Sequence, residues 1–348
     1  MNRFYILWVC LVWLAVSASC AHQEVPDGGN EPTRLLITAE GLDGILSRAA
    51  TEVGTEGERT CSELYIYYFR TNGTFITCQR VTPAGGSALY PLTVDAPIEV
   101  TAGKVDIIVF ASPAGIVMPD RPTKTELEAL RTTGMTGDGN TLLYTGNRAI
   151  PMSGKVSGIS FETNKAVSIN LRRSVAKLRI CVNNGADPGE NVTLHTDRMS
   201  LQLLNLRAKI PYLPLAAGIY TPEDIAVFDS QNFGNGGAAF VPETTAGGAA
   251  TWHHIAYVGE HLFDETEPFA LPDNRAALHL NVPYTIGDDG EEEQINKYRL
   301  PLDFALKRNH IYQITVNIYG PGEGPTMVNA EIDVMILPWE EIDADVIE

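Results

Sequence analysis

Residues 312–319, YQITVNIY, and residues 329–336, NAEIDVMI, decide the class of fold. In both stretches apolar side chains stand at every second position, and Gly320-Pro321-Gly322 lies between them. A period of two residues is typical of a β-strand that buries one face, and glycine with proline marks a turn. We therefore expect two β-strands joined by a turn in this part of the chain.

The same alternation recurs along the chain, whereas helical periodicity is scarce. Thr123-Lys124-Thr125-Glu126 is a capping-box pattern and predicts one short helix that leads into Leu127. Phe233–Ala250 is rich in glycine and alanine and is interpreted as a long loop. Many short strands with one helix predict an all-β protein made of two β-sandwiches, with a boundary near Arg173. The other expected strands are Leu64–Phe69, Val105–Phe110, Ala166–Leu171, Val175–Val182, Met199–Leu206, Leu278–Val282 and Tyr298–Phe304, the last two joined by a turn at Gly287-Asp288-Asp289-Gly290.

The N-terminal residues have the order of a lipoprotein export signal. Asn2-Arg3 supplies positive charge, Tyr5–Val16 is apolar, and small residues lead into Cys20. Cys20 is therefore the expected lipidation site. A polar tether follows, then a strand-like stretch at Arg34–Glu40, and then Arg48 between Ser47 and Ala49 in a small, polar setting.

Size and charge narrow the classes of function. The chain has 348 residues and a hydrophobic content of 44%, which suits two globular domains with cores. Its formal net charge is −18, without a cluster of lysine and arginine, so nucleic acid is not an expected partner. No later apolar stretch approaches the ~20 residues of a membrane-spanning helix, so Cys20 is the expected route of membrane attachment.

The cysteines after the signal predict free thiols. An Asn72-Gly73 turn would place Arg70 opposite Phe75, and this register keeps Cys61 and Cys78 too far apart to form a disulfide. Cys181 adds no metal-binding spacing, so a zinc site is not expected.

Other residues that suggest chemistry are assigned structural roles. His253-His254 and His261 lack a carboxylate at ligand spacing, and the acidic residues after Asp289 do not form a calcium loop. Trp252 and Tyr257 are expected in the core, and His310 begins a strand without a nucleophile motif beside it. Sequence motifs of common enzyme classes are missing, so neither catalysis nor a cofactor is expected.

Several motifs together resemble the fimbrillins, the major fimbrial subunits (type V pilins) of Bacteroidales bacteria. At the C-terminal end these are Arg308-Asn309-His310-x-Tyr312, the two alternating strands with their turn, and Pro338-Trp339. In the middle, Pro151-Met152-Ser153-Gly154 and the run Arg173–Lys177 are similar to the domain junction of that family. Near the N-terminus, Cys20 and Ser47-Arg48-Ala49 resemble its lipid-bearing cysteine and its maturation site.

The resemblance implies two transthyretin-like β-sandwich domains and an ordered maturation. Residues 1–20 would be the lipoprotein signal, 21–48 a propeptide with a removable strand, 49–172 the N-terminal sandwich and 173–348 the C-terminal sandwich. An arginine-specific protease would cut between Arg48 and Ala49, and Arg59 is a competing site. The strand donated to the next subunit would carry Ile332, Val334 and Ile336, or else Ile342, Ala344 and Val346.

The expected partners are other fimbrial subunits in head-to-tail assembly, the maturation protease and, before cleavage, the outer membrane through the lipid on Cys20. The expected location is the outer membrane and then an extracellular fimbria that supports adhesion. Two alternatives stay open: an anchor or tip subunit of the fimbria, and a surface glycan-binding lipoprotein.

Overall fold

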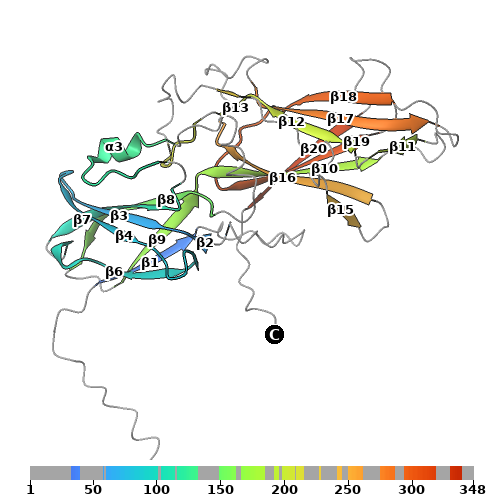
Figure 1. The fold of residues 1–348 in the computed structure, drawn as a ribbon. Coiled ribbons are helices and arrows are strands. Elements are labelled where there is room, and N and C mark those ends of the chain that lie inside the picture. Colours follow the sequence, from blue (N-terminus) through green and yellow to red (C-terminus); the bar gives the residue numbers. More distant parts are fainter. Residues whose placement is uncertain are drawn as a thin grey trace, which may run out of the picture.

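The computed structural model is an all-β structure, as the sequence predicts. In the part of the chain that it describes, the strands are joined by one short α-helix, α3 (Lys124–Glu128), and one 3-10 helix, η1 (Ile98–Val100). Figure 1 shows strands β1 to β9 gathered in one half of the molecule and strands β10 to β20 in the other. The described residues are 33–39, 58, 60–100, 103–113, 116–131, 149–161, 166–184, 192–195, 198–207, 209–214, 227–228, 241–244, 250–261, 275–286, 294–318 and 330–338.

The first half is built around a seven-stranded sheet in the order β4-β3-β7-β8-β9-β1-β6. One face of these strands encloses a core that includes Leu35, Ile66, Val109 and Ile169, all fully buried. The strands are β1 (Arg34–Ala39), β3 (Leu64–Arg70), β4 (Phe75–Val81), β6 (Leu92–Asp95), β7 (Lys104–Ala111), β8 (Met152–Ser160) and β9 (Ala166–Arg173), with a small pair formed by β2 (Thr60–Cys61) and β5 (Ala88–Leu89).

The predicted hairpin forms with nearly the predicted register. Leu64 to Tyr68 pair with Val81 to Thr77 as expected, but a bulge after Tyr68 places Phe69, rather than Arg70, opposite Phe75. The two rings meet edge to face with 5.8 Å between centroids, and this contact suits the shifted pairing. Cys61, Cys78 and Cys181 are free thiols, as predicted.

The capping box predicted at Thr123 is present. The Thr123 hydroxyl accepts from the backbone N–H of Glu126, and the Glu126 carboxylate accepts from the backbone N–H of Thr123. The helix ends after Glu128 and buries Leu127 on the outer face of the first sheet, in an aromatic cluster with Tyr67, Phe110 and Tyr212. Both faces of the central strands are therefore covered, which explains why Leu64–Phe69 is apolar at nearly every position.

The second half packs two sheets against each other. A five-stranded sheet has the order β15-β16-β10-β19-β20, and a second sheet has the order β11-β17-β12 with β18 beside β17. Leu178, Ile314, Leu201 and Leu280 belong to the core between them. The strands are β10 (Val175–Asn184), β11 (Val192–Leu194), β12 (Ser200–Leu204), β15 (Val241–Thr244), β16 (Ala250–Gly259), β17 (Ala277–Ile286), β18 (Gln294–Pro301), β19 (His310–Ile318) and β20 (Ala330–Pro338), and β13 (Leu206–Arg207) pairs with β14 (Val227–Phe228).

The structure corrects two expectations. Phe233–Ala250 is not a continuous loop, because Val241–Thr244 forms the edge strand β15 against β16. Strands β8 and β16, like several shorter strands, were not among the predicted strands. The domain limits at residues 172 and 173 stay a prediction; β9 ends at Arg173 and β10 begins at Val175, so only Ser174 separates them.

Candidate assembly interface

Strand β1 lies inside the first sheet and not at its edge. Its residues pair in parallel with β9, from Arg34 opposite Ala166 to Ala39 opposite Leu171, and antiparallel with β6. Leu35 and Ile37 point into the core with no exposed surface, while Leu36 on the other face is 38% exposed. This follows directly from the two-residue period of the sequence RLLITA. Removing β1 would open the core and leave unpaired backbone groups along both β6 and β9.

Polar contacts at both ends of β1 hold it in register. The Thr38 hydroxyl donates to the Asn170 side-chain oxygen at 2.7 Å, and the backbone N–H of Ala96 donates to the Thr33 carbonyl at 2.8 Å. These contacts join β1 to its two neighbours. Within the described residues, β1 is held by its pairing with β6 and β9 and by one buried face.

The predicted lipidation and cleavage residues, Cys20, Arg48 and Ala49, lie outside the described residues. Glu58 is the first described residue after β1, and it is buried at the junction of the two halves. The Lys177 ammonium lies 3.0 Å from its carboxylate, with both side chains 1% exposed. The Tyr257 hydroxyl also donates to this carboxylate, and the Arg173 guanidinium donates to the Glu58 carbonyl at 3.2 Å.

Glu58 therefore connects the chain just before β2 to strands β9, β10 and β16. Thr60 and Cys61, which follow it, are buried as well. Arg59, the competing cleavage site, lies outside the described residues, but its two neighbours are both withdrawn from solvent. Sequence reasoning did not identify Glu58, because nothing local indicates that its partner is more than a hundred residues away.

The motif at Arg308 has a structural role at the same junction. The Arg308 guanidinium donates to the carbonyls of Tyr212 at 2.9 Å and Pro211 at 3.1 Å, and to the Glu260 carboxylate at 3.1 Å. Burial lowers the pKa of Arg308, and the charge of Glu260 opposes that shift. Asn309 adopts a positive φ of 57° and accepts from the Arg173 side chain at 3.3 Å. Arg308 and Asn309 thereby fix the start of β19 against the first half.

The last described strand, β20, lies at the edge of the five-stranded sheet. Ile336 pairs with Tyr312, and Val334 pairs with Ile314, so their side chains share the face on which Tyr312 and Ile314 are fully buried. Val334 and Ile336 are nevertheless 40% and 56% exposed, and Met335 on the other face is 49% exposed. Ile332 is also in β20, whereas Ile342, Ala344 and Val346 lie outside the described residues.

The residues considered for other chemistry have ordinary places in the fold. His253, His254 and Trp252 belong to β16, Tyr257 is 2% exposed, and the His310 ring contacts the Arg308 carbonyl. Among the described residues, no three histidine, cysteine, aspartate or glutamate side chains gather as a metal-binding group. Within the same residues, no helix has the length and apolar character needed to span a membrane.

The packed sheets of the two halves define the molecule as an all-β sandwich protein. Solved structures of this fold include fimbrilin FimA of Porphyromonas gingivalis, 13% identical with a TM-score of 0.51, covering 89% of this chain and 98% of that one. The tip fimbrial protein Mfa3 of Porphyromonas gingivalis, with a C-terminal truncation, is 13% identical with a TM-score of 0.50, covering 89% and 100%. A Parabacteroides distasonis protein described as a cell adhesion protein is 16% identical with a TM-score of 0.56, covering 88% and 97%.

The chain belongs to the family of fimbrillin-A associated anchor proteins Mfa1 and Mfa2, whose model matches residues 48–345. None of the curated proteins matches the sequence. The family consists of structural fimbrial proteins and not of enzymes. Membership places the chain among proteins of surface fimbriae, which assemble with other fimbrial subunits.

Proposed function

We propose that the chain is a fimbrial subunit that is exported as a lipoprotein through Cys20, cut after Arg48, and joined to its neighbours by strand exchange. The observation that carries the proposal is the position of β1, with Leu35 and Ile37 buried between β6 and β9. While β1 is present, the groove is filled by the chain itself. The precursor is therefore inert towards other subunits until β1 leaves.

Loss of β1 leaves an empty strand position between β6 and β9, which favours the binding of another strand. Two rows of backbone N–H and C=O groups lose their partners, and the core loses two fully buried side chains. An extended segment from another subunit with apolar residues at two-residue spacing satisfies both needs at once. Because the groove and the donated strand are different surfaces, the contact is head-to-tail and produces an open fibre.

The C-terminal region supplies the donor in this proposal. Val334 and Ile336 lie on one side of β20 and are incompletely covered in their own subunit, and Ile332 continues the same two-residue spacing in the sequence. The later Ile342, Ala344 and Val346 have the same spacing and are the second candidate. Burying three or four such side chains would contribute about 5–10 kcal/mol before the cost of ordering the strand.

The contacts of Glu58 support a cut at Arg48 over a cut at Arg59. Cleavage after Arg59 would detach Glu58 from the mature subunit and leave the Lys177 ammonium buried without its carboxylate partner. Breaking a buried ion pair in this way costs about 3–5 kcal/mol. A protease also requires an accessible, extended segment, and Glu58 and Thr60 are both buried.

The cleavage step is tested with Arg48→Ala and Arg59→Ala precursors treated with an arginine-specific protease. We expect Arg48→Ala to stay a folded, soluble monomer, and Arg59→Ala to polymerise like the parent. Electron microscopy and size-exclusion chromatography report the outcome, with mass spectrometry of the new N-terminus as the direct readout. Fibres from Arg48→Ala as abundant as those of the parent would overturn the proposed site.

The donor step is tested by two truncations. A chain ending at Trp339 lacks the acidic tail, and a chain ending at Gly324 lacks β20 as well. If the chain ending at Trp339 polymerises and the chain ending at Gly324 does not, β20 is the donor. If neither chain polymerises, the donor is the acidic tail, alone or together with β20. Normal polymerisation of the chain ending at Gly324 would remove the C-terminal region from the mechanism.

An anchor role is the second candidate, and the description of the matching family favours it. An anchor would keep lipidated Cys20 and β1, and would offer only its donor strand to the fibre. The N-terminus of the protein isolated from cells distinguishes the two roles: a start at Ala49 supports the polymerising subunit, and a start at lipidated Cys20 supports the anchor.

A further inference from the structure

A cavity of about 690 Å³ lies on the outer face of the first sheet, away from the core that contains β1. Strands β3 and β4 form its floor, and residues 116–121, which lead into α3, form its wall. We call it the outer-face cavity; it takes no part in the proposed assembly. Its size lies within the range of about 300–1,000 Å³ that is usual for small-molecule sites.

The wall of the outer-face cavity is held firmly in place. The Tyr67 hydroxyl donates to the Pro119 carbonyl at 2.8 Å, and Met118 beside it is 5% exposed. Tyr67 itself is fully buried and packs edge to face on Phe110. These contacts fix the backbone at Pro119, directly after Met118, and so give the wall a defined position before any ligand arrives.

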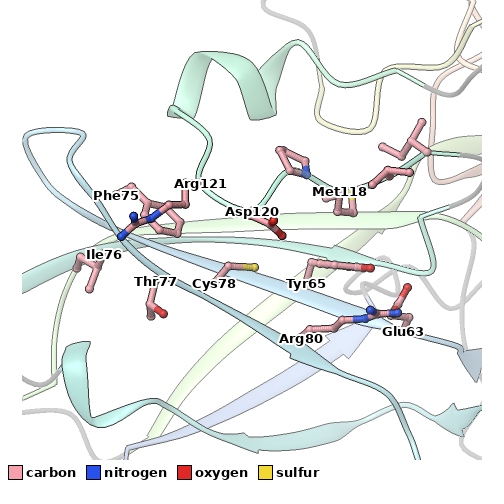
Figure 2. A pocket seen from close by; sticks show the side chains of 13 residues that line it. Glu63, Tyr65, Phe75, Ile76, Thr77, Cys78, Arg80, Met118, Asp120 and Arg121 are labelled. Carbon is pink, nitrogen blue, oxygen red and sulfur yellow. The ribbon is translucent and has the colours of Figure 1, made fainter.

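The lining combines apolar surfaces with planar polar groups. Tyr65 and Phe75 give an aromatic floor, Met118 gives the wall an apolar surface, and Val117 at the rim is 95% exposed. Figure 2 shows Asp120 directed towards Cys78 and Tyr65, Arg121 beside Phe75, and Arg80 against Glu63. Burial raises the pKa of the Cys78 thiol, so this sulfur is a neutral packing group and not a nucleophile.

The charged groups of the outer-face cavity balance. Its lining contains two carboxylates, Glu63 and Asp120, and two guanidinium groups, Arg80 and Arg121. Glu63 and Arg80 form an ion pair, whereas Asp120 and Arg121 are exposed and have no ion pair with another described residue. A carboxylate accepts hydrogen bonds from two neighbouring hydroxyl groups of a sugar, and a guanidinium group donates hydrogen bonds to two. An aromatic ring packs against the C–H face of a pyranose ring.

The outer-face cavity opens on the face of the sheet that carries Tyr65, Cys78 and Arg80, so a compact ligand approaches it from that face. β4 is also an edge strand of the sheet. Addition of an extended peptide along β4 is the competing mode of binding, and a peptide probe distinguishes it from the binding of a sugar.

We propose that the outer-face cavity binds a neutral hexose unit of a glycan, with Asp120 and Arg121 as the hydrogen-bonding pair and the Phe75 ring as the apolar contact. Tyr65 is not the stacking surface, because the Arg80 guanidinium lies over its ring, 5.6 Å from the centroid. The balance of charge favours a neutral sugar over an acidic one. The uncommitted Asp120 carboxylate would repel a sialic acid or uronate, and would accept hydroxyl hydrogens from a neutral hexose.

The test uses the full chain, labelled with ¹³C in its methyl groups, titrated with four probes. These are methyl α-D-mannopyranoside, methyl β-D-galactopyranoside, N-acetylneuraminic acid and an alternating Val-Thr peptide. We expect a neutral hexoside to shift the methyl signals of Met118, Val117 and Thr77 with a dissociation constant on the order of 1 mM. Asp120→Ala and Arg121→Ala should each weaken this binding about tenfold or more.

The matched controls are Lys104→Met and Glu99→Gln, which remove exposed charges elsewhere on the first half. They should bind the hexoside like the parent, and the unchanged methyl spectra of all four variants report that the fold is intact. Binding of the acidic sugar alone, binding of the peptide alone, or no shift of the cavity signals with any probe would each overturn the proposal.

Discussion

Strands β1 and β10 occupy the same position in the two halves of the molecule. Each lies inside a sheet, parallel to one neighbour, β9 or β19, and antiparallel to the other, β6 or β16. They differ in length and burial. β1 forms four residue pairs with β6 and six with β9, whereas β10 forms nine with β16 and eight with β19.

The difference in burial is the more instructive one. β1 is buried on one face, through Leu35 and Ile37. β10 is buried on both faces: Leu178 and Ile180 lie in the main core, while Lys177 and Cys181 are covered on the other side. A central place in a sheet therefore does not by itself make a strand permanent. We infer that β1 is built to be exchanged and that β10 is built to stay.

The largest effect is expected from Lys177→Met. The substitution fills the same space but leaves the Glu58 carboxylate buried without its cation, so the free energy of unfolding should fall by about 3–5 kcal/mol. Urea denaturation of the precursor and of the product cut after Arg48 measures the loss, which should be equal in both. The matched control is the double variant Glu58→Gln with Lys177→Met, which removes both charges and should recover most of the stability. A loss below about 1 kcal/mol in the single variant would show that the pair does not hold the junction together.

A smaller effect, but the sharper comparison, is expected from Ile37→Ala and Ile180→Ala. Both residues are fully buried, so each substitution should destabilise the precursor by about 2–5 kcal/mol. In the polymer, where β1 has been removed, the cost of Ile37→Ala should vanish while that of Ile180→Ala persists. The denaturant midpoint of each of the two variants is measured in the precursor and in the polymer, and the four values are compared with those of the parent. If Ile37→Ala weakens the polymer as much as the precursor, β1 has not left the subunit.

The all-β fold was predictable because its signals are local. The alternation at residues 312–319 and 329–336 became β19 and β20, and Arg34–Glu40 became β1. The capping box needs only four consecutive residues, and the hairpin register needs only its Asn72-Gly73 turn. β15 and β8 were missed because Val241–Thr244 is short and follows many glycines, and because Met152–Ser160 mixes apolar with small polar residues.

The interface was only partly predictable, because its decisive contacts join distant parts of the chain. The sequence indicated that β1 and β20 exist, but not that β1 is an inner strand or that Val334 and Ile336 lie uncovered at an edge. Glu58 and Lys177 look like ordinary charged residues until the fold brings them together. The same holds for the outer-face cavity, since Glu63 and Arg80 of the hairpin meet residues 116–121 only after the sheet has formed.

The smallest effect is expected on the exposed side of β1, and it tests one-sided burial directly. Leu36→Asn changes a side chain that is 38% exposed, so precursor stability should change by no more than about 0.5 kcal/mol. The counterpart in β10 is Cys181→Asn, on the face opposite to Leu178 and Ile180. Cys181 is 5% exposed, so a buried amide there should cost about 1–3 kcal/mol. Thermal unfolding of the two variants beside the parent gives the contrast. Equal losses would mean that the outer face of β1 is covered as β10 is, and would remove the physical reason for calling β1 the exchangeable strand.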